Sequence, residues 1–415
     1  MSLIKTSILN GAAVIIKMLT LLGLNKILAV YIGPSGYASI GQFQNIIQVI
    51  ITFASGAINT GVTKYTAEYN DDVKHQRTIW GTAGVISLVS TLLVSLIIVV
   101  FSKKMAILFL KEESYASVFV WFSITLVFFV FNSLMLAVLN GKKEVTSYVI
   151  ANIAGSIFSL IVVCIMTVAL GLYGALVSLA IYQSLSFFVT LYLCYRLKWF
   201  RFGFFFGPIN AKVAVDLSKY TFMALTSAIC VPASHMFIRG YLGNSLGLDA
   251  AGHWEAMWRL SSAYLMMVTT TLGLYYLPRL SELKEKRELR KEIINGYKII
   301  LPVVIVCALI MYLLRENIVV YLFSVKFLAV SELFAFQLFG DTIRIASWLL
   351  GYLLIAKAYL TLYVVSEVIF TGLFAFLVPT LVSKFGFEGA AMAHAVTYIF
   401  HFSFIYVALK LKRVI

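Results

Sequence analysis

The feature that most constrains this sequence is a series of apolar stretches, each roughly 20 residues or longer, that recurs along the whole chain. The hydrocarbon core of a bilayer is about 30 Å thick, and roughly 20 residues of α-helix cross it. Charged residues make up only 12% of the chain, whereas they make up about 25% of a typical soluble domain. The sequence therefore predicts an all-α integral membrane protein.

The apolar stretches predict about twelve transmembrane helices. An even number of spans places both termini on the same side of the membrane. The connections on that side contain 22 Lys and Arg residues, against 6 on the other side, and this asymmetry predicts cytoplasmic termini. The predicted spans are residues 7–31, 38–62, 79–101, 116–139, 146–170, 172–194, 218–241, 254–277, 298–314, 332–355, 361–381 and 388–409.

The chain contains an internal repeat at a shift of 215 residues. Lys142 falls on Lys357 at this shift, and the segment Gly171-Leu-Tyr-Gly-Ala falls on Gly386-Phe-Glu-Gly-Ala. Because each copy has six helices, both copies have the same orientation, and transporters with such repeats bind substrate between them. We predict two six-helix lobes, residues 1–205 and 206–415.

Polar residues recur every three or four positions in the second predicted span. This spacing keeps them on one face of a helix, and a polar face in a membrane should contact protein or water. The residues are Gln42, Asn45, Gln48, Thr52, Ser55, Asn59 and Thr63.

Charged residues at membrane depth are basic more often than acidic, which favours an anionic substrate. Lys17, nearer the middle of its span, is a better cavity candidate than Lys26, which can instead reach the outer interface. Glu255 and Asp341 can each form an ion pair with an arginine of their own helix, so a purely structural role is an alternative for these acids. The basic residues are Lys17, Lys26, Arg239, Arg259 and Arg344, and the acidic residues are Glu255, Asp341 and Glu367.

Several functional classes are excluded or left without a signal. The net charge of +15 comes mostly from short connections between spans, which does not indicate nucleic-acid binding. We find no phosphate-binding loop and no segment long enough for a nucleotide-binding domain. Cysteines and histidines lack metal-ligand spacing, so we expect no metal or cofactor. Coupling to a proton or sodium gradient would use Glu255, Asp341 or Glu367.

Several ungapped segments resemble the polysaccharide flippases of the multidrug/oligosaccharidyl-lipid/polysaccharide exporter superfamily, in particular those that translocate enterobacterial common antigen units. The resemblance covers nearly the full length. The segments are Gly61-Val-Thr-Lys-Tyr, Leu217-Ser-Lys-Tyr-Thr-Phe-Met-Ala-Leu, Tyr276-Leu-Pro-Arg-Leu-Ser, Gly340-Asp-Thr-Ile-Arg and Gly351-Tyr-Leu-Leu-Ile-Ala-Lys-Ala.

This resemblance implies a two-lobe transporter that opens alternately to each side of a bacterial inner membrane. Its expected substrate is an undecaprenyl-pyrophosphate-linked oligosaccharide, either an O-antigen repeat or a common-antigen unit, and its expected partners are membrane lipids, a polysaccharide polymerase and a chain-length regulator. Arg259 does not match a family position, so its substrate role comes from the polar pattern alone. The positions that match are Lys17, Lys26, Lys64, Arg239 and Asp341.

Two other functions stay open from the sequence. A cation-coupled multidrug exporter of the same superfamily would need an acidic cavity, but Glu255 and Asp341 each have a neighbouring arginine. A polytopic polymerase or ligase would handle the same lipid-linked sugars, but those enzymes usually carry a large periplasmic loop. Here the longest outer connections, residues 102–115, 242–253 and 315–331, are short.

Overall fold

The computed structural model describes residues 3–70, 72–276, 279–280, 283, 285–357 and 359–412. Leu277, Pro278 and Ser281 of one family segment, and Ala358 of another, lie outside the described residues. The described part of the chain is helical and contains no strand. The longer helices are α1 (Leu3–Ala54), α2 (Asn59–Glu68), α3 (Val73–Met105), α4 (Ala116–Gly141), α5 (Val145–Tyr195), α6 (Ala211–Ser245), α7 (Leu248–Thr271), α9 (Lys286–Leu313), α10 (Arg315–Leu322), α11 (Phe334–Ala356), α12 (Leu360–Phe385) and α13 (Glu388–Leu411).

The predicted spans fall mainly on helices. Helix α5 contains two of them, and α1 contains the first and most of the second. Glycines in the left-handed region interrupt both long helices, at Gly33 (φ 77°) and Gly171 (φ 57°). Eight stretches of the described chain are long and apolar enough to cross a membrane. The chain is therefore a multi-pass membrane protein. The last residue of the predicted span 254–277 lies outside the described residues.

The second predicted span needs one correction. The helix ends at Ala54, because Gly56 and Ala57 adopt positive φ angles of 64° and 52°. A new helix, α2, begins at Asn59. Asn59 therefore lies on a different helix from Gln42 and Asn45, and the polar residues between 42 and 63 do not form one continuous helical face.

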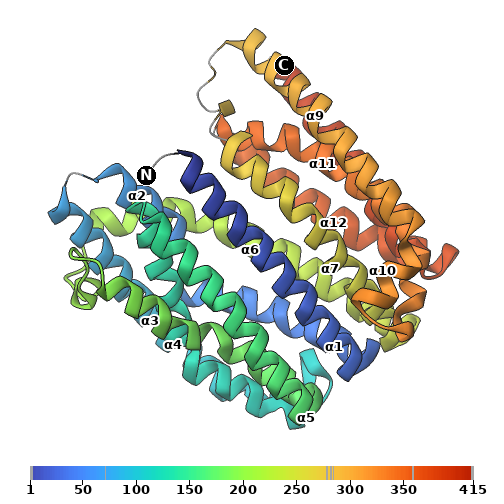
Figure 1. Ribbon diagram of the computed structural model, residues 1–415, viewed down its shortest axis with the longest axis horizontal. Helices are drawn as coiled ribbons and strands as arrows, with labels where there is room; N and C mark the ends of the chain where they lie inside the picture. The colour runs from blue at the N-terminus through green and yellow to red at the C-terminus, as the bar shows by residue number, and fades with distance from the viewer. Residues whose placement is uncertain are drawn as a thin grey trace. The chain divides into compact units, whose positions relative to one another are not determined.

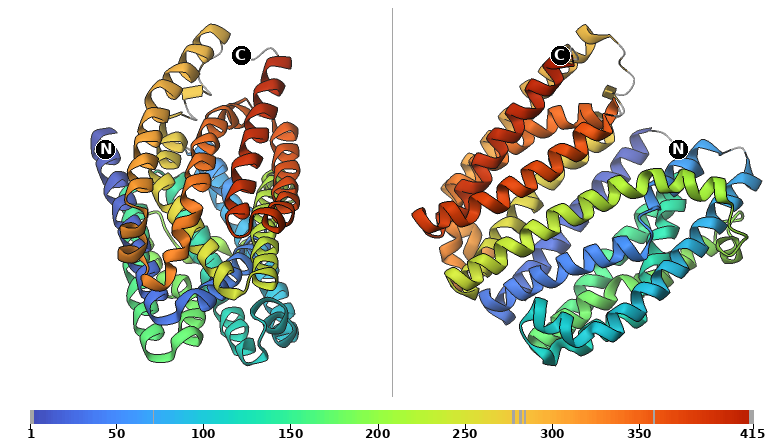
Figure 2. Two further views of the ribbon diagram at one scale, coloured as in Figure 1. Left: turned by 90° about the vertical axis from the view of Figure 1, so that its right-hand side faces the viewer. Right: turned by 180° about the vertical axis from the view of Figure 1, so that it is seen from behind.

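The chain forms two compact units, which we describe separately. Unit 1 contains Met1–Ile32 and Ser39–Pro232, and unit 2 contains Gly33–Ala38 and Ala233–Ile415. In unit 1, α4 packs against α3 and α5 (Figure 1). In unit 2, α13, drawn in red, packs against α11 and α12 (Figure 2). The lobe boundary after residue 205 stays a prediction.

The short segment at the break in α1 is held within unit 2. Gly252 on α7 lies so close to Pro34 that a Cβ there would be 1.8 Å from the Pro34 carbonyl oxygen. Tyr37 is fully buried and contacts Phe323 and Phe327 edge-on, with ring centroids 5.9 and 5.4 Å away. These contacts fix the position of Tyr37, which lies beside the charged cluster of α6 and α7 described below.

The internal repeat is visible as two equivalent tight turns. Gly171 has φ 57° and ψ −137°, and Gly386, 215 residues later, has φ 63° and ψ −144°. Three residues after each turn, a glycine meets the backbone of the preceding helix: a Cβ at Gly174 would lie 1.9 Å from the Met166 carbonyl oxygen, and one at Gly389 would lie 2.4 Å from that of Leu381. The same residues build the same turn in both copies.

Replacing Gly174 or Gly389 by Ala is expected to lower the free energy of unfolding by about 1–3 kcal/mol, because the added methyl would overlap a backbone carbonyl. The measurement is the thermal midpoint of the detergent-purified protein. Gly372→Ala is the matched control, since no heavy atom lies within 4 Å of its would-be Cβ and Ala is the better helix former. Equal midpoints for all three variants would contradict this account of the turns.

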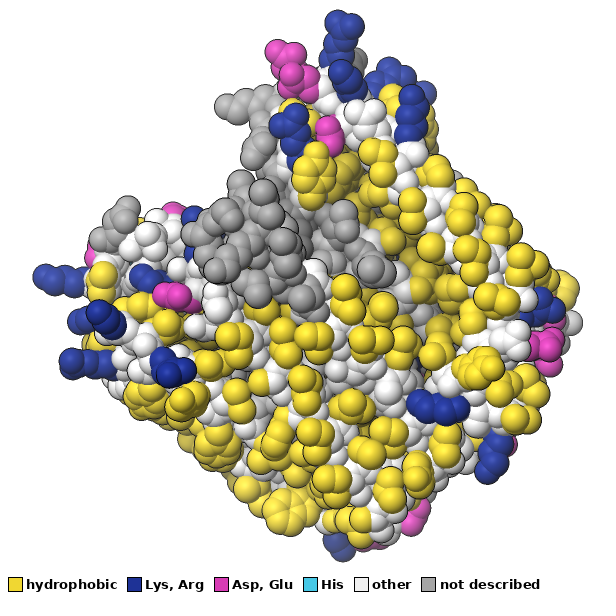
Figure 3. Space-filling model, in the orientation of Figure 1, with side chains coloured by type: hydrophobic (Ala, Val, Ile, Leu, Met, Phe, Trp, Pro, Cys, Tyr) yellow, Lys and Arg dark blue, Asp and Glu magenta, His cyan; other side chains and the backbone are white. Residues whose placement is uncertain are grey.

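Much of the described surface is formed by hydrophobic side chains, as expected for a protein that contacts lipid. Hydrophobic side chains cover most of the described face in Figure 3, and Lys and Arg gather toward its margins. Large hydrophobic residues are exposed on several long helices, among them Leu96 on α3, Ile165 on α5 and Leu309 on α9. An apolar surface of this extent is unfavourable in water and favourable in a bilayer.

Candidate functional site

Unit 1 contains a cavity of about 220 Å³ between α1, α4 and α5, which we call the Lys17 cavity. Lys17, the predicted cavity residue of the first span, lines it, and its side chain is exposed. The remaining polar groups are neutral amides and hydroxyls. These are Thr20, Asn132, Asn152, Ser156, Ser159, Tyr182, Gln183 and Ser186.

A second cavity of about 610 Å³ in unit 1, the Asn59 cavity, lies where α1 ends and α2 begins. Gln183 lines both cavities, so the two are adjacent. The lining contains no charged side chain among the described residues. Its polar residues are Gln48, Thr52, Ser55, Asn59, Thr60, Ser133 and Gln183.

Four other predicted binding residues do not line these two cavities. Gln42, Asn45 and Lys26 are half-buried, and Lys64 is exposed. The Asn45 side-chain amide donates a hydrogen bond to the Pro232 carbonyl oxygen at 3.5 Å. The structure therefore places Lys17 in one cavity of unit 1, and the predicted polar residues Gln48, Thr52, Ser55 and Asn59 in the adjacent one.

Unit 2 contains a buried charged cluster of Arg239, Glu255 and Arg259. The Glu255 carboxylate accepts a hydrogen bond from Arg259 Nε at 2.7 Å and another from Arg239 Nη1. The Arg259 guanidinium also lies 4.8 Å from the ring centroid of Tyr37. The pair of Glu255 with Arg259 is the predicted one, but Arg239 is held by the same carboxylate. With two arginines and one glutamate, the cluster has a net charge of +1.

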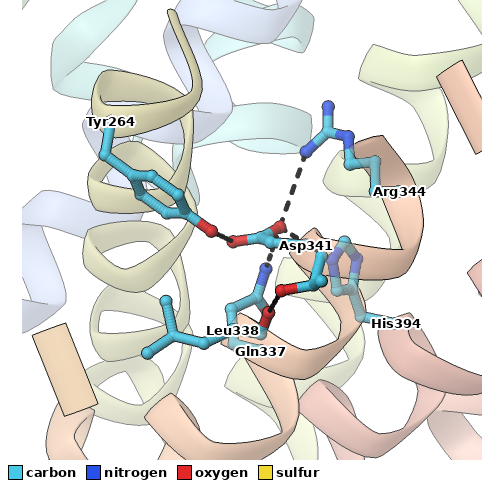
Figure 4. A network of polar contacts seen from close by, with 7 residues as sticks. Tyr264, Gln337, Leu338, Asp341, Arg344 and His394 are labelled. Carbon is cyan, nitrogen blue, oxygen red and sulfur yellow. Dashed lines mark hydrogen bonds and ion pairs between the residues drawn. The ribbon is translucent and has the colours of Figure 1, made fainter. Parts of the chain in front are cut away.

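Asp341 on α11 is the centre of a second network (Figure 4). It is fully buried, and one of its carboxylate oxygens accepts a hydrogen bond from the Tyr264 hydroxyl at 2.9 Å. The other oxygen lies 3.0 Å from His394 Nε2 and 3.5 Å from Gln337 Nε2. Arg344 Nη1, the predicted partner, is 4.0 Å from the same oxygen. The predicted ion pair exists, but the closest partners come from α7 and α13.

Arg344 is surrounded by aromatic rings. Its guanidinium carbon lies 4.4 Å from the ring centroid of Trp348, 5.0 Å from that of Trp258 and 5.5 Å from that of Tyr398. Its Nε and Nη1 atoms are buried and lack a hydrogen-bond partner within the described part of the chain. An aromatic surround holds a planar cation in place without using its N–H groups. Arg344 therefore retains capacity to bind an anion.

Glu367 on α12 lines a cavity of about 200 Å³ in unit 2. The other polar side chains of its wall are Tyr352, Tyr363, Ser366 and His401, and Trp348 is also part of it. His401 Nδ1 lies 2.7 Å from the Ser347 hydroxyl. Glu367 is thus the one acid of the three predicted here that lines a described cavity, whereas Glu255 and Asp341 lie inside polar networks.

The sequence reasoning missed several residues of these sites. Asn132 and Gln183 are single amides in stretches whose other side chains are apolar or carry only hydroxyls, so they produce no helical pattern of amides. Tyr264 and His394 come from α7 and α13 and reach Asp341 across helices, which spacing within one helix does not reveal. No group of three or more His, Cys, Asp and Glu able to hold a metal ion occurs among the described residues.

Comparison of the fold with solved structures finds transporters. The chain superposes on an inward-facing multidrug resistance MATE family transporter of the MOP superfamily with a TM-score of 0.76, covering 95% of each chain at 16% identity. It superposes on the lipid II flippase MurJ in an inward closed conformation with a TM-score of 0.71, covering 98% of this chain and 87% of that chain at 15% identity. These similarities show a shared fold.

Comparison of sequences is more specific. The chain is 30% identical over 403 residues to the Lipid III flippase of Escherichia coli (strain K12), and the match covers 97% of each chain. The Lipid III flippase of Shigella flexneri matches to the same extent. The profile of the family described as polysaccharide biosynthesis protein matches residues 3–284. The chain therefore belongs to this polysaccharide biosynthesis protein family.

Proposed function

We propose that this protein is a flippase that moves an undecaprenyl-pyrophosphate-linked oligosaccharide across a bacterial inner membrane. Transport runs from the cytoplasmic to the periplasmic leaflet by alternating access, with both termini in the cytoplasm. The observation that carries this proposal is the match along 97% of the chain to proteins named Lipid III flippases. A transporter, rather than a polymerase or ligase, is what this similarity supports.

The charges and cavities of the two units are consistent with such a substrate. Lys17 is exposed in a polar cavity of unit 1, and Arg344 retains N–H groups for an anion in unit 2. Arg239 and Arg259 share one carboxylate, so they contribute a fixed excess of positive charge. A pyrophosphate is attracted by such cations, whereas a cationic drug is repelled. Lys26 and Lys64 stay proposed contacts on the family resemblance, and Gln42 and Asn45 stay proposed contacts on the polar pattern of the second span.

A strain deleted for the gene tests this function. We expect lipid-linked oligosaccharide to accumulate with its sugars on the cytoplasmic side, and the surface glycan to disappear. The wild-type gene should restore the surface glycan, and Lys17→Ala should restore it less well than Lys17→Arg, because only the latter keeps the charge. Mass spectrometry of the accumulated lipid would identify the substrate as an O-antigen repeat or a common-antigen unit.

Normal lipid intermediates and normal surface glycan in the deletion strain, with no second flippase present, would contradict the proposal. Lost resistance to cationic drugs in that strain would then favour the multidrug exporter. Under the flippase proposal, the translocated unit passes to a polysaccharide polymerase whose product length is set by a chain-length regulator.

Coupling to a proton or sodium gradient is a further part of the proposal, and we assign it to Glu367 because this acid lines a cavity. Glu367→Gln is expected to abolish the dependence of transport on an imposed gradient, since the amide carries no charge to bind or release a cation. Flux into proteoliposomes with and without a gradient measures it, with Glu388→Gln as the control. Gradient dependence of wild-type size in Glu367→Gln would rule out this role.

A further inference from the structure

Several hydroxyls that line the two unit 1 cavities can only accept a hydrogen bond from a ligand. In the Lys17 cavity, the hydroxyls of Thr20, Ser156 and Ser186 each donate to a backbone carbonyl one turn earlier in the same helix, at 2.8, 2.9 and 3.1 Å. In the Asn59 cavity, the Thr52 hydroxyl donates to the Gln48 carbonyl oxygen at 2.9 Å. A hydroxyl that has given its proton to the backbone can only accept another hydrogen bond.

Two side-chain amides of the same walls also donate to the protein. Asn152 donates its Nδ2 to the Tyr148 carbonyl oxygen at 2.8 Å, and Gln183 donates its Nε2 to the Tyr182 hydroxyl at 2.9 Å. Each amide therefore uses one of its two N–H donors on the protein itself. Its acceptor oxygen and its second N–H remain for a ligand, and Gln183 is placed where both cavities meet.

Two buried acceptors have no partner within the described chain. Asn132, which lines the Lys17 cavity, is only 4% exposed, and its Oδ1 makes no hydrogen bond there. The Oδ1 of Asn59, in the wall of the other cavity, is in the same condition. A buried carbonyl oxygen without a donor costs about 1–3 kcal/mol, and a ligand that brings donors removes this cost.

A ligand that matches these walls must bring many hydrogen-bond donors and little charge. The hydroxyl groups of a sugar meet this requirement, because each can donate to an acceptor on the wall. A pyrophosphate carries only acceptors, and Lys17 is the single cationic side chain among the lining residues of the two cavities. The chemistry of the lining therefore suits the sugar part of a lipid-linked oligosaccharide better than its pyrophosphate.

We propose that the Lys17 and Asn59 cavities form the subsite for neutral sugar residues of the transported oligosaccharide, with Asn132 and Gln183 as residues that determine its specificity. This inference rests on the proposed flippase function. Gln183 contacts sugars at the junction of the two cavities, and Asn132 accepts from a sugar hydroxyl deep in the smaller one. Lys17 lies at the charged end of the subsite.

The variants Asn132→Leu and Gln183→Leu test this subsite in proteoliposomes. The substrate is the lipid-linked oligosaccharide that accumulates in the deletion strain, and the comparison ligand is undecaprenyl pyrophosphate without sugars. Each variant is expected to reduce transport of the oligosaccharide at least about tenfold, the cost of one or two lost hydrogen bonds in a buried site. The affinity for the sugar-free lipid should change by less than about twofold, because this lipid makes no hydrogen bond to either residue.

Asn140→Leu is the matched control, because Asn140 lies on the same helix as Asn132 but is exposed. Thermal stability separates a binding role from a structural one. Asn132→Leu removes a buried oxygen that has no partner, so its thermal midpoint should equal or exceed that of the wild type. A lowered midpoint, or equal losses for both ligands, would overturn the sugar subsite.

The result for the wild type separates this inference from the function on which it rests. If wild-type protein transports the oligosaccharide and both variants transport it equally well, the subsite is wrong and the flippase function stands. If wild-type protein does not transport it, the flippase function fails, and the subsite fails with it.

Discussion

Glu255→Gln is expected to destabilise the protein by about 3–5 kcal/mol, because it leaves two buried arginines without their shared counter-charge. Arg239 and Arg259 are 3% and 8% exposed, so water cannot replace the lost carboxylate. Glutamine has nearly the same size and keeps one oxygen for hydrogen bonding, so the loss is one of charge rather than of volume. The measurement is the thermal midpoint and the yield of folded protein in detergent.

The double variant Arg239→Gln/Glu255→Gln distinguishes this electrostatic explanation from a packing defect. Removing one arginine together with the carboxylate leaves a single buried cation, so the double variant should be more stable than Glu255→Gln alone. Glu288→Gln, at an exposed position of α9, serves as the control for the same chemical change. A double variant less stable than the single one would show that side-chain packing, and not charge, dominates this cluster.

This cluster shows where sequence reasoning was sufficient and where it was not. The pair of Glu255 with Arg259 follows from the i, i+4 spacing of one helix. Arg239 binds the same carboxylate from α6, 16 residues away in sequence, and no helical period connects the two positions. Contacts within a helix could be predicted from the sequence, whereas contacts between helices depended on packing that the sequence pattern does not encode.

The fold was predictable because the bilayer imposes a length on every span. Helices α3, α4 and α13 each correspond to one predicted apolar stretch. The break after Ala54 was missed because polar residues at 52, 55, 59 and 63 keep a helical spacing through it. Gly56 is one glycine within this pattern, and the positive φ of Ala57 has no signature in residue type. Asn132 was missed for a related reason, since one amide in an apolar run changes the hydropathy very little.

Arg344→Lys is expected to reduce transport of the lipid-linked oligosaccharide at least about tenfold while the protein stays folded. The guanidinium has two buried nitrogens, Nε and Nη1, that make no hydrogen bond in the described structure, within a surround of three aromatic rings. A planar fork binds phosphate oxygens in pairs, whereas a lysine ammonium acts as a point charge. A charge-assisted hydrogen bond is worth about 1.5–3 kcal/mol, and about 1.4 kcal/mol corresponds to a tenfold change.

The reason that folding should survive this substitution is that Asp341 does not depend on Arg344. Its carboxylate accepts a hydrogen bond from Tyr264 at 2.9 Å and lies 3.0 Å from His394, both closer than Arg344 Nη1 at 4.0 Å. Lysine also preserves the positive charge. Arg290→Lys, at an exposed position of α9, is the matched control. Binding of undecaprenyl pyrophosphate should weaken in Arg344→Lys and stay nearly unchanged in Asn132→Leu, so unaltered binding in Arg344→Lys would exclude Arg344 as a pyrophosphate ligand.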